Sequence, residues 1–244
     1  MIRMSLRDAW EKEAENWIRF ARTPGHDRTF WRFGLPHFLA LLPAPEGLTV
    51  DVGCGEGRLP VLLRERGFEV VGIDASSTLV RKATEDGARR YAVADGARLP
   101  LRAECARLVT AYMSLQDMDD LGGAVREVGR ILSPGGRFCF SILHPIATAG
   151  GYSERKADAP FIIEDSYLTP RRYTYHTDRG GIPMTFASEH RPLEAYFRAL
   201  EDAGLQVERF VEPPIADDLV MDDETELRWV RLPIYLFVRA VKPH

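Results

Sequence analysis

Three glycines alternate at positions 53, 55 and 57, directly after the apolar run that ends at Val52. Asp74 follows about twenty residues later, at the end of a second apolar run. Glycines in such a loop let the backbone turn tightly and approach a ligand closely, because no Cβ intervenes. A carboxylate at the end of the second strand can accept hydrogen bonds from both hydroxyls of a ribose. The spacing therefore predicts a site for a cofactor that contains a nucleoside.

The details of the loop indicate which kind of cofactor it holds. Dinucleotide-binding loops read G-x-G-x-x-G and seat a pyrophosphate on the following helix N-terminus, whereas here Arg58 stands where the last glycine would be. Asp51 and Glu56 place negative charge on both sides of the turn, and this charge would repel a pyrophosphate. The same acids suit a cofactor that carries an ammonium and a sulfonium. A dinucleotide-dependent oxidoreductase is therefore disfavoured.

At this point a family resemblance is visible. Residues 50–60 resemble the first motif of the class I S-adenosylmethionine-dependent methyltransferases, in their small-molecule, type 11-like branch. The likeness continues in order through residues 72–74, 94–100, 108–120 and the Pro-Gly-Gly turn within 126–136. The resemblance implies S-adenosyl-L-methionine as the methyl donor and S-adenosyl-L-homocysteine as the product.

The resemblance also implies which residues contact the cofactor. They stand at the ends of the first four predicted strands: Asp51, Gly53, Cys54, Gly55, Asp74, Ala75, Asp95, Gly96, Ala97, Ala111 and Met113. The loop and the end of the fourth strand would face the methionine part. Asp74 would bind the ribose, and Asp95 would hydrogen-bond the adenine.

The residues for catalysis are less defined. Many small-molecule members of the family carry a histidine just after the fourth strand, but this chain has Leu115-Gln116-Asp117-Met118 there. His144 and Asp117 are the candidate bases, because both lie at the sheet edge where ligands bind in open α/β folds. A base is needed only if the acceptor is protonated at neutral pH, so its use stays open. No metal site is predicted, since no cluster of His and Cys residues is present.

The alternation of strand and helix patterns predicts an α/β fold: a Rossmann-like, doubly wound, seven-stranded and mostly parallel sheet with an antiparallel last strand. Strands are expected at 48–52, 69–73, 90–94, 106–113, 137–143, 206–211 and 232–241. Helices are expected at 5–21, 30–42, 59–66, 77–86, 121–132 and 192–203.

Three regions are distinguished by their patterns. Residues 1–45 form an N-terminal helical cap, and residues 46–144 with 188–244 form the cofactor-binding domain. Residues 145–187 show no clear hydrophobic periodicity. An irregular stretch of this length within a compact domain usually has a function. We expect an insertion after the fifth strand that contains short strands or a lid over the acceptor site, or that serves a dimer interface. The acidic stretch 212–226 is expected to be a solvated loop.

Composition limits the partners. The net charge of -4 provides no general attraction to nucleic acid or to anionic membranes, and no apolar run is long enough to span a bilayer. The first residues lack the pattern of a signal peptide, so a cytoplasmic monomer or homodimer with three reduced cysteines is expected. The expected acceptor is a small organic molecule. Two alternatives stay open: methylation of RNA or protein, and a non-catalytic cofactor-binding module.

Overall fold

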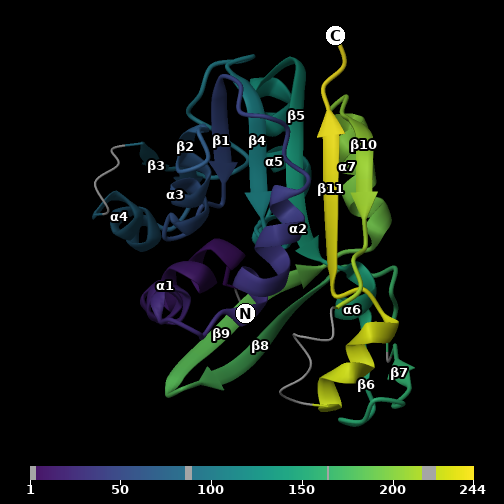
Figure 1. The fold of residues 1–244 in the computed structure, drawn as a ribbon. Coiled ribbons are helices and arrows are strands. Elements are labelled where there is room, and N and C mark those ends of the chain that lie inside the picture. The colour runs from purple at the N-terminus through teal and green to yellow at the C-terminus, as the bar shows by residue number, and fades with distance from the viewer. Residues whose placement is uncertain (1–3, 86–89, 164, 216–223) are drawn as a thin grey trace.

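The computed structural model describes residues 4–85, 90–163, 165–215 and 224–244, and one seven-stranded sheet crosses it (Figure 1). The strand order is β10-β11-β5-β4-β1-β2-β3. The parallel strands in chain order are β1 (Leu48–Val52), β2 (Glu69–Asp74), β3 (Tyr91–Val93), β4 (Ala106–Tyr112) and β5 (Leu132–Leu143). The last strand, β11 (Tyr235–Val241), runs antiparallel to both β5 and β10 (Gln206–Val211). The predicted fold class is confirmed.

Both faces of the sheet are buried, as in other parallel sheets. Side chains alternate along β5: Phe138 and Phe140 face α5 (Leu121–Ile131) and α7 (Leu193–Asp202), whereas Cys139 faces the opposite layer. That layer contains η1 (Phe30–Gly34), α2 (Leu35–Leu39) and α3 (Arg58–Arg64). Two hydrophobic layers therefore hold the strand ends rigidly.

The order of the strands fixes the place of the site. The chain proceeds from β1 outward to β2 and β3, and then returns to the other side of β1 with β4 and β5. In open α/β sheets, ligands bind at the carboxyl ends of the strands where the direction of winding reverses. The crevice is therefore expected between the ends of β1 and β4, at Val52 and Tyr112.

The N-terminal helix α1 (Leu6–Arg22) begins with Ser5 as its N-cap, whose Oγ accepts a 3.0 Å hydrogen bond from the amide of Asp8. Its apolar stripe packs on β9 (Ile182–His190) and on α4 (Ser77–Glu85). Figure 1 shows α1 and the β8–β9 hairpin lying across the end of the sheet where β4 terminates.

One predicted helix differs in detail. Residues 30–42 form a π-helical turn over Phe30–Gly34 and then a short α-helix that ends at Leu39, in place of one continuous helix. Pro36 cannot donate the regular backbone hydrogen bond, and the amide of Leu35 bonds to the carbonyl of Phe30 instead. Gly34 in this turn lies against the hydroxyl of Tyr112, where a Cβ would not fit.

The insertion after β5 consists of α6 (Pro145–Ala149) and two hairpins. The smaller hairpin pairs β6 (Gly151–Tyr152) with β7 (Phe161–Ile162), and the larger pairs β8 (Arg171–Arg179) with β9. The larger hairpin continues to His190, three residues beyond the predicted boundary at 187, because His190 still pairs with Arg171.

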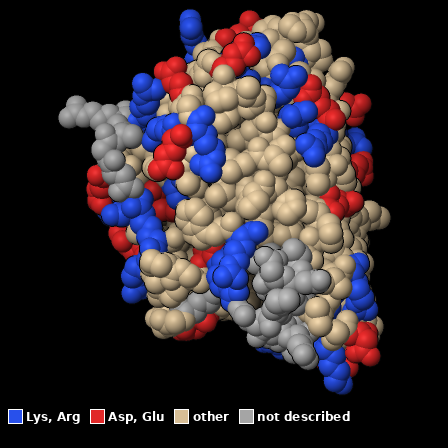
Figure 2. Space-filling view, viewed as in Figure 1, with Lys and Arg blue, Asp and Glu red and all other residues tan. Residues whose placement is uncertain are grey.

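The C-terminal part differs from the expected pattern in one respect. A 3-10 helix, η3 (Glu224–Arg231), precedes β11, which starts at Tyr235 rather than at residue 232. The predicted acidic loop at 212–226 lies largely outside the described residues. No helix in the described ranges is long and apolar enough to cross a membrane. Figure 2 shows basic and acidic side chains intermixed around one face, whose centre is mostly uncharged.

Candidate functional site

A cavity of about 710 Å³ lies at the carboxyl ends of β1, β2 and β4. Gly53, Asp74 and Met113 contribute the wall on the side of the sheet. The opposite wall comes from α1 and from the β8–β9 hairpin, through aromatic side chains such as Trp17 and Phe186. Elements that are far apart in the sequence thus enclose one space, whose volume is typical of a site for a cofactor or a small ligand.

The glycine loop is fixed by bonds to the end of β2. The amides of Gly53 and Cys54 donate to the carbonyl of Ile73 at 2.7 and 3.1 Å. One oxygen of Asp74 accepts from the amide of Gly55, and the other accepts from the amide of Ser76, both at 2.8 Å. Each oxygen keeps a further lone pair, so Asp74 can also bind hydroxyl groups in the cavity. Enclosure by protein raises the pKa of Asp74 above its usual range, and its two backbone hydrogen bonds lower it.

Most of the residues implied by the family resemblance come together here. The cavity is lined by Gly53, Gly55, Asp74, Ala75, Asp95, Gly96 and Met113. Asp95 also accepts a 2.9 Å hydrogen bond from the amide of Ala97, which holds the loop after β3. Cys54, Ala97 and Ala111 are not among the lining residues; Cys54 and Ala111 are buried behind the wall.

Asp51 is buried in β1 and does not line the cavity. Its Oδ1 accepts a 2.6 Å hydrogen bond from the hydroxyl of Thr110 on the neighbouring strand. Burial raises the pKa of Asp51 to about 7, while the Thr110 hydroxyl acts in the opposite direction. Asp51 is therefore placed to support the strand ends rather than to touch a ligand directly.

Arg58 and Glu56 join the glycine loop to the N-terminal segment. Trp17 Nε1 donates a 2.7 Å hydrogen bond to Glu56 Oε2, and the Arg58 guanidinium pairs with Asp27 at 2.7 Å. The same guanidinium lies 3.8 Å from the ring centroid of Phe30, a cation–π contact. Arg58 thus holds the cap in place.

The outer wall is a cluster of aromatic rings from α1 and β9. Trp10 and Trp17 meet edge to face at 5.7 Å between ring centroids, and Phe186 lies 6.0 Å from each of them. Tyr175 stacks on Phe186 from the partner strand of the hairpin. Such a wall offers an apolar surface to a bound molecule and keeps water away from it.

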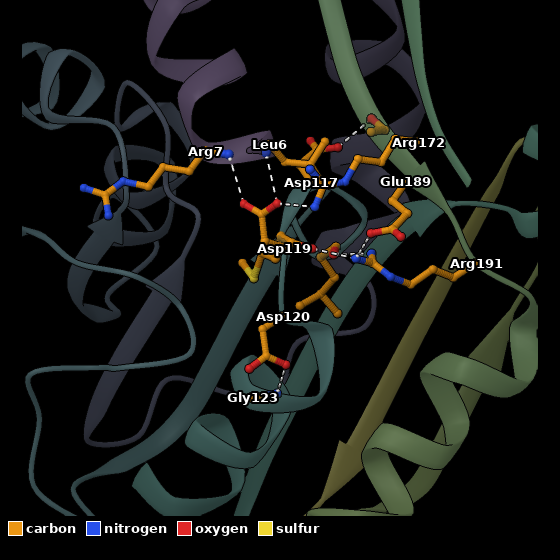
Figure 3. A network of polar contacts seen from close by, with 12 residues as sticks. Leu6, Arg7, Asp117, Asp119, Asp120, Gly123, Arg172, Glu189 and Arg191 are labelled. Atoms are coloured by element: carbon orange, nitrogen blue, oxygen red, sulfur yellow. Dashed lines mark hydrogen bonds and ion pairs between the residues drawn. The ribbon is translucent and has the colours of Figure 1, made fainter. Parts of the chain in front are cut away.

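Two carboxylates fix α1 over the cavity. Asp119 Oδ1 accepts from the amide of Leu6 at 3.1 Å and from Arg172 at 2.5 Å, and Asp119 Oδ2 accepts from the amide of Arg7 at 3.3 Å (Figure 3). A carboxylate at a helix N-terminus is favourable, because the helix dipole places positive charge there. From the next turn of α1, Glu11 accepts hydrogen bonds from the hydroxyls of Ser76, Ser77 and Thr78 at the start of α4.

Asp117 lies at the cavity wall in the segment after β4. Its Oδ1 accepts a 2.6 Å hydrogen bond from the hydroxyl of Ser188 on β9. Enclosure by protein raises the pKa of Asp117 to about 8, although Ser188 and the positive charge of Arg191 act against this. The carboxyl group is therefore mostly protonated at neutral pH.

His144 does not line the cavity. Its Nε2 lies 2.8 Å from Glu212 Oε1, and its Nδ1 accepts a hydrogen bond from the amide of Ile146 and so caps α6. Burial lowers the pKa of His144, and the Glu212 carboxylate partly opposes this. No histidine is among the described residues that line the cavity. The geometry therefore gives His144 a structural position.

One face of the β8–β9 hairpin lines the cavity, and four residues on it were not found from the sequence: Arg171, Tyr175, Phe186 and Ser188. Arg171, Tyr173 and Tyr175 alternate on one face of β8, and Ser188 and Phe186 stand opposite them on β9. A signal for this face exists in the sequence, because Gly180-Gly181 follows a stretch with strand periodicity, as in a hairpin. Gln116 was likewise not singled out. Among the described residues, no group of three or more His, Cys, Asp or Glu could hold a metal ion.

Known methyltransferases are similar to part of this chain. Residues 50–140 match the model of a family described as "Methyltransferase domain". A malonyl-[acyl-carrier protein] O-methyltransferase of Pectobacterium atrosepticum is 33% identical over 146 residues, which are 58% of this chain and 54% of that protein. A demethylmenaquinone methyltransferase of Thermus thermophilus is 36% identical over 106 residues, 41% of this chain and 48% of that one. The chain thus matches about half the length of these curated relatives.

A solved structure covers more of the chain. An S-adenosylmethionine-dependent methyltransferase from Mesorhizobium loti superimposes with a TM-score of 0.70 at 27% identity, over 84% of this chain and 96% of that one. The likeness therefore extends beyond the segment that the family model matches.

Proposed function

Since the chain belongs to the class I S-adenosylmethionine-dependent methyltransferases, we propose that it transfers a methyl group to a small organic acceptor within the cavity at the strand ends. The observation that supports this most is the shared cavity. One wall holds the glycine loop and Asp74, and the facing wall holds the aromatic cluster of α1 and β9. A donor and an acceptor can therefore lie side by side with water excluded.

The residues present fit S-adenosylmethionine. Asp74 would bind the ribose hydroxyls and Asp95 the adenine, while Gly53 and Gly55 leave room for the methionine part. Gln116 Oε1 is buried at the same wall without a hydrogen-bond partner, and we propose that it accepts a hydrogen bond from the cofactor's ammonium group. When bound, the cofactor supplies an electrophilic methyl group on a sulfonium.

The protein's own contribution would be alignment and exclusion of water. The tethers of α1 at Asp119 and Glu11 close one side of the cavity, and the aromatic wall orients the acceptor. Positioning of two reactants in this way can lower a barrier by several kcal/mol. His144 lies outside the cavity, and the raised pKa of Asp117 disfavours its proton-accepting carboxylate form at neutral pH. An acceptor that is already nucleophilic at neutral pH fits best.

The test is whether S-adenosylhomocysteine binds, and binding is measured by its effect on thermal unfolding. We expect a clear rise in Tm with S-adenosylhomocysteine and none with NAD. Asp74→Ala should abolish the rise, because it removes the ribose contacts and weakens affinity by roughly 100-fold or more. Exposed Asp202 on α7 provides the matched control, and Asp202→Ala should leave the rise intact. An unchanged Tm of the unmodified protein at saturating S-adenosylhomocysteine contradicts the proposal.

A further inference from the structure

Besides Gln116 Oε1, two further buried polar groups at the cavity wall have no regular hydrogen-bond partner, and both of these come from β8. They are Nη1 of Arg171 and the hydroxyl of Tyr173, which has Ser188 beside it but no hydrogen bond of regular geometry. Leaving a buried polar group unpaired costs about 1–3 kcal/mol, and more for a charged group. Unpaired groups at the wall of a ligand cavity therefore point to a ligand that pairs with them.

The guanidinium of Arg171 is held in a fixed orientation. Its Nη2 donates to the carbonyls of Thr148 and Ala149 at the end of α6, both at 2.9 Å. These bonds leave Nη1 available. Tyr173 lies two residues further along the same strand, so both side chains project from the same face of β8 toward the cavity.

The charge of Arg171 is not balanced within the described residues. None of their carboxylates forms an ion pair with it, although other arginines of the hairpin region do, such as Arg172 with Asp119 and Arg191 with Glu189. Asp117 is the acid whose charge would act on Tyr173. Its carboxyl group is bonded to Ser188, and enclosure keeps it mostly neutral at pH 7. Among the described residues, Arg171 is therefore a positive charge at the cavity wall that no carboxylate pairs with.

We propose that Arg171 and Tyr173 bind a carboxylate of the methyl acceptor, which makes the acceptor a carboxylic acid with an apolar body. This inference rests on the proposed methyltransferase function. A carboxylate has two oxygens, and the site offers donors from two groups, the Nη1 amino group of Arg171 and the hydroxyl of Tyr173. The apolar body would lie against Tyr175 and Phe186, further along the same face of the hairpin.

The experiment uses a matched pair of probes, octanoate and its neutral analogue octanamide. Each is titrated into the full-length protein saturated with S-adenosylhomocysteine, and binding is followed by calorimetry. We expect octanoate to bind more tightly than octanamide. Arg171→Gln should weaken octanoate binding roughly 10- to 100-fold and octanamide binding little, because it removes a charge-assisted hydrogen bond.

Two further variants and one control complete the test. Tyr173→Phe should weaken octanoate binding roughly 3- to 10-fold, and Arg171→Lys should retain more affinity than Arg171→Gln because it keeps the positive charge. Arg198→Gln removes the same charge from the exposed face of α7 and should change nothing.

The outcomes separate this inference from the proposed function. A rise in Tm with S-adenosylhomocysteine in Arg171→Gln shows that the variant is folded and keeps its cofactor site. Three outcomes, each with S-adenosylhomocysteine still bound, refute the carboxylate site and leave the methyltransferase proposal standing. In the first, octanoate does not bind. In the second, octanoate binds no better than octanamide, and in the third, neither Arg171→Gln nor Tyr173→Phe changes octanoate binding. If S-adenosylhomocysteine itself fails to bind the unmodified protein, the methyltransferase proposal fails first.

Discussion

The indole Nε1 of Trp17 donates a 2.7 Å hydrogen bond to Oε2 of Glu56, so helix α1 is bonded directly to the glycine loop. Glu56 is only 1% exposed, and its other oxygen lies 3.5 Å from Nε of Arg58. A buried carboxylate of this kind depends on its few partners. The position of α1 and the conformation of the loop are therefore linked.

Loss of the Trp17 hydrogen bond should affect both stability and ligand binding. Trp17→Phe keeps an aromatic ring but leaves Glu56 with one partner fewer, and we expect a loss of about 1–3 kcal/mol in the free energy of unfolding. Affinity for S-adenosylhomocysteine should fall severalfold, since the loop loses support. Urea denaturation and calorimetry measure the two effects. Trp31→Phe, at a side chain that is 45% exposed, is the control. Equal behaviour of the two variants would argue against the link.

Two glycines with similar backbone angles should respond differently to alanine. Gly57 (φ +89°) caps α3, and an added Cβ there would lie 2.8 Å from the Cβ of Ala83. Gly25 (φ +82°) has nothing within 4 Å of such a Cβ. Gly25→Ala should cost about 1–2 kcal/mol from backbone strain alone, and Gly57→Ala should cost roughly 1–3 kcal/mol more. Chemical denaturation of both variants compares them, and equal losses would contradict the close approach of Gly57 to Ala83 on α4.

Asp117 should make stability depend on pH. Its folded-state pKa of about 8 is far above the value of an exposed aspartate, so the folded protein holds a proton that the unfolded chain has released. Stability should therefore fall as pH rises from about 4 to 8. Asp117→Asn removes the titrating group, so the total loss of stability between these pH values should become smaller by roughly 2–4 kcal/mol. This figure is discounted because water in the cavity screens part of the effect. Unfolding curves at a series of pH values measure it. A slope that is unchanged in the variant would show that Asp117 is ionised at neutral pH.

His144 should contribute on the acidic side. Burial lowers its pKa in the folded state, so the stability that it contributes is present above the unfolded pKa of about 6.5 and is lost as pH falls through the lower folded value. His144→Gln should reduce this acid sensitivity and cost about 1 kcal/mol through the cap of α6. Binding of S-adenosylhomocysteine should be unchanged, because His144 does not line the cavity. A large loss of that binding would place His144 at the site after all.

Much of the fold followed from local patterns. Three features can be read from residues close together in the sequence: the glycine loop, the acid at Asp74 and the alternation of strands with helices. Together they predict a parallel sheet with the loop and the acid at its edge. The predicted seven-stranded, mostly parallel sheet and its antiparallel last strand, β11, are confirmed. The irregular turn at Phe30–Gly34 was missed, because its cause is the combination of Pro36 with the close approach of Gly34 to Tyr112. That approach joins residues that are distant in the sequence.

The sequence by itself determined the sheet and the side of it where a nucleoside would bind, because the turn at Gly53–Gly57 and the strand that ends at Asp74 are set by local geometry. Only the tertiary structure decided which side chains face the cavity from outside the sheet. The side chains of Trp17, Arg171 and Tyr173 line the cavity at the ends of strands that are distant from them along the chain. Such contacts depend on how α1 and the β8–β9 hairpin pack, and no local pattern of residues encodes that packing.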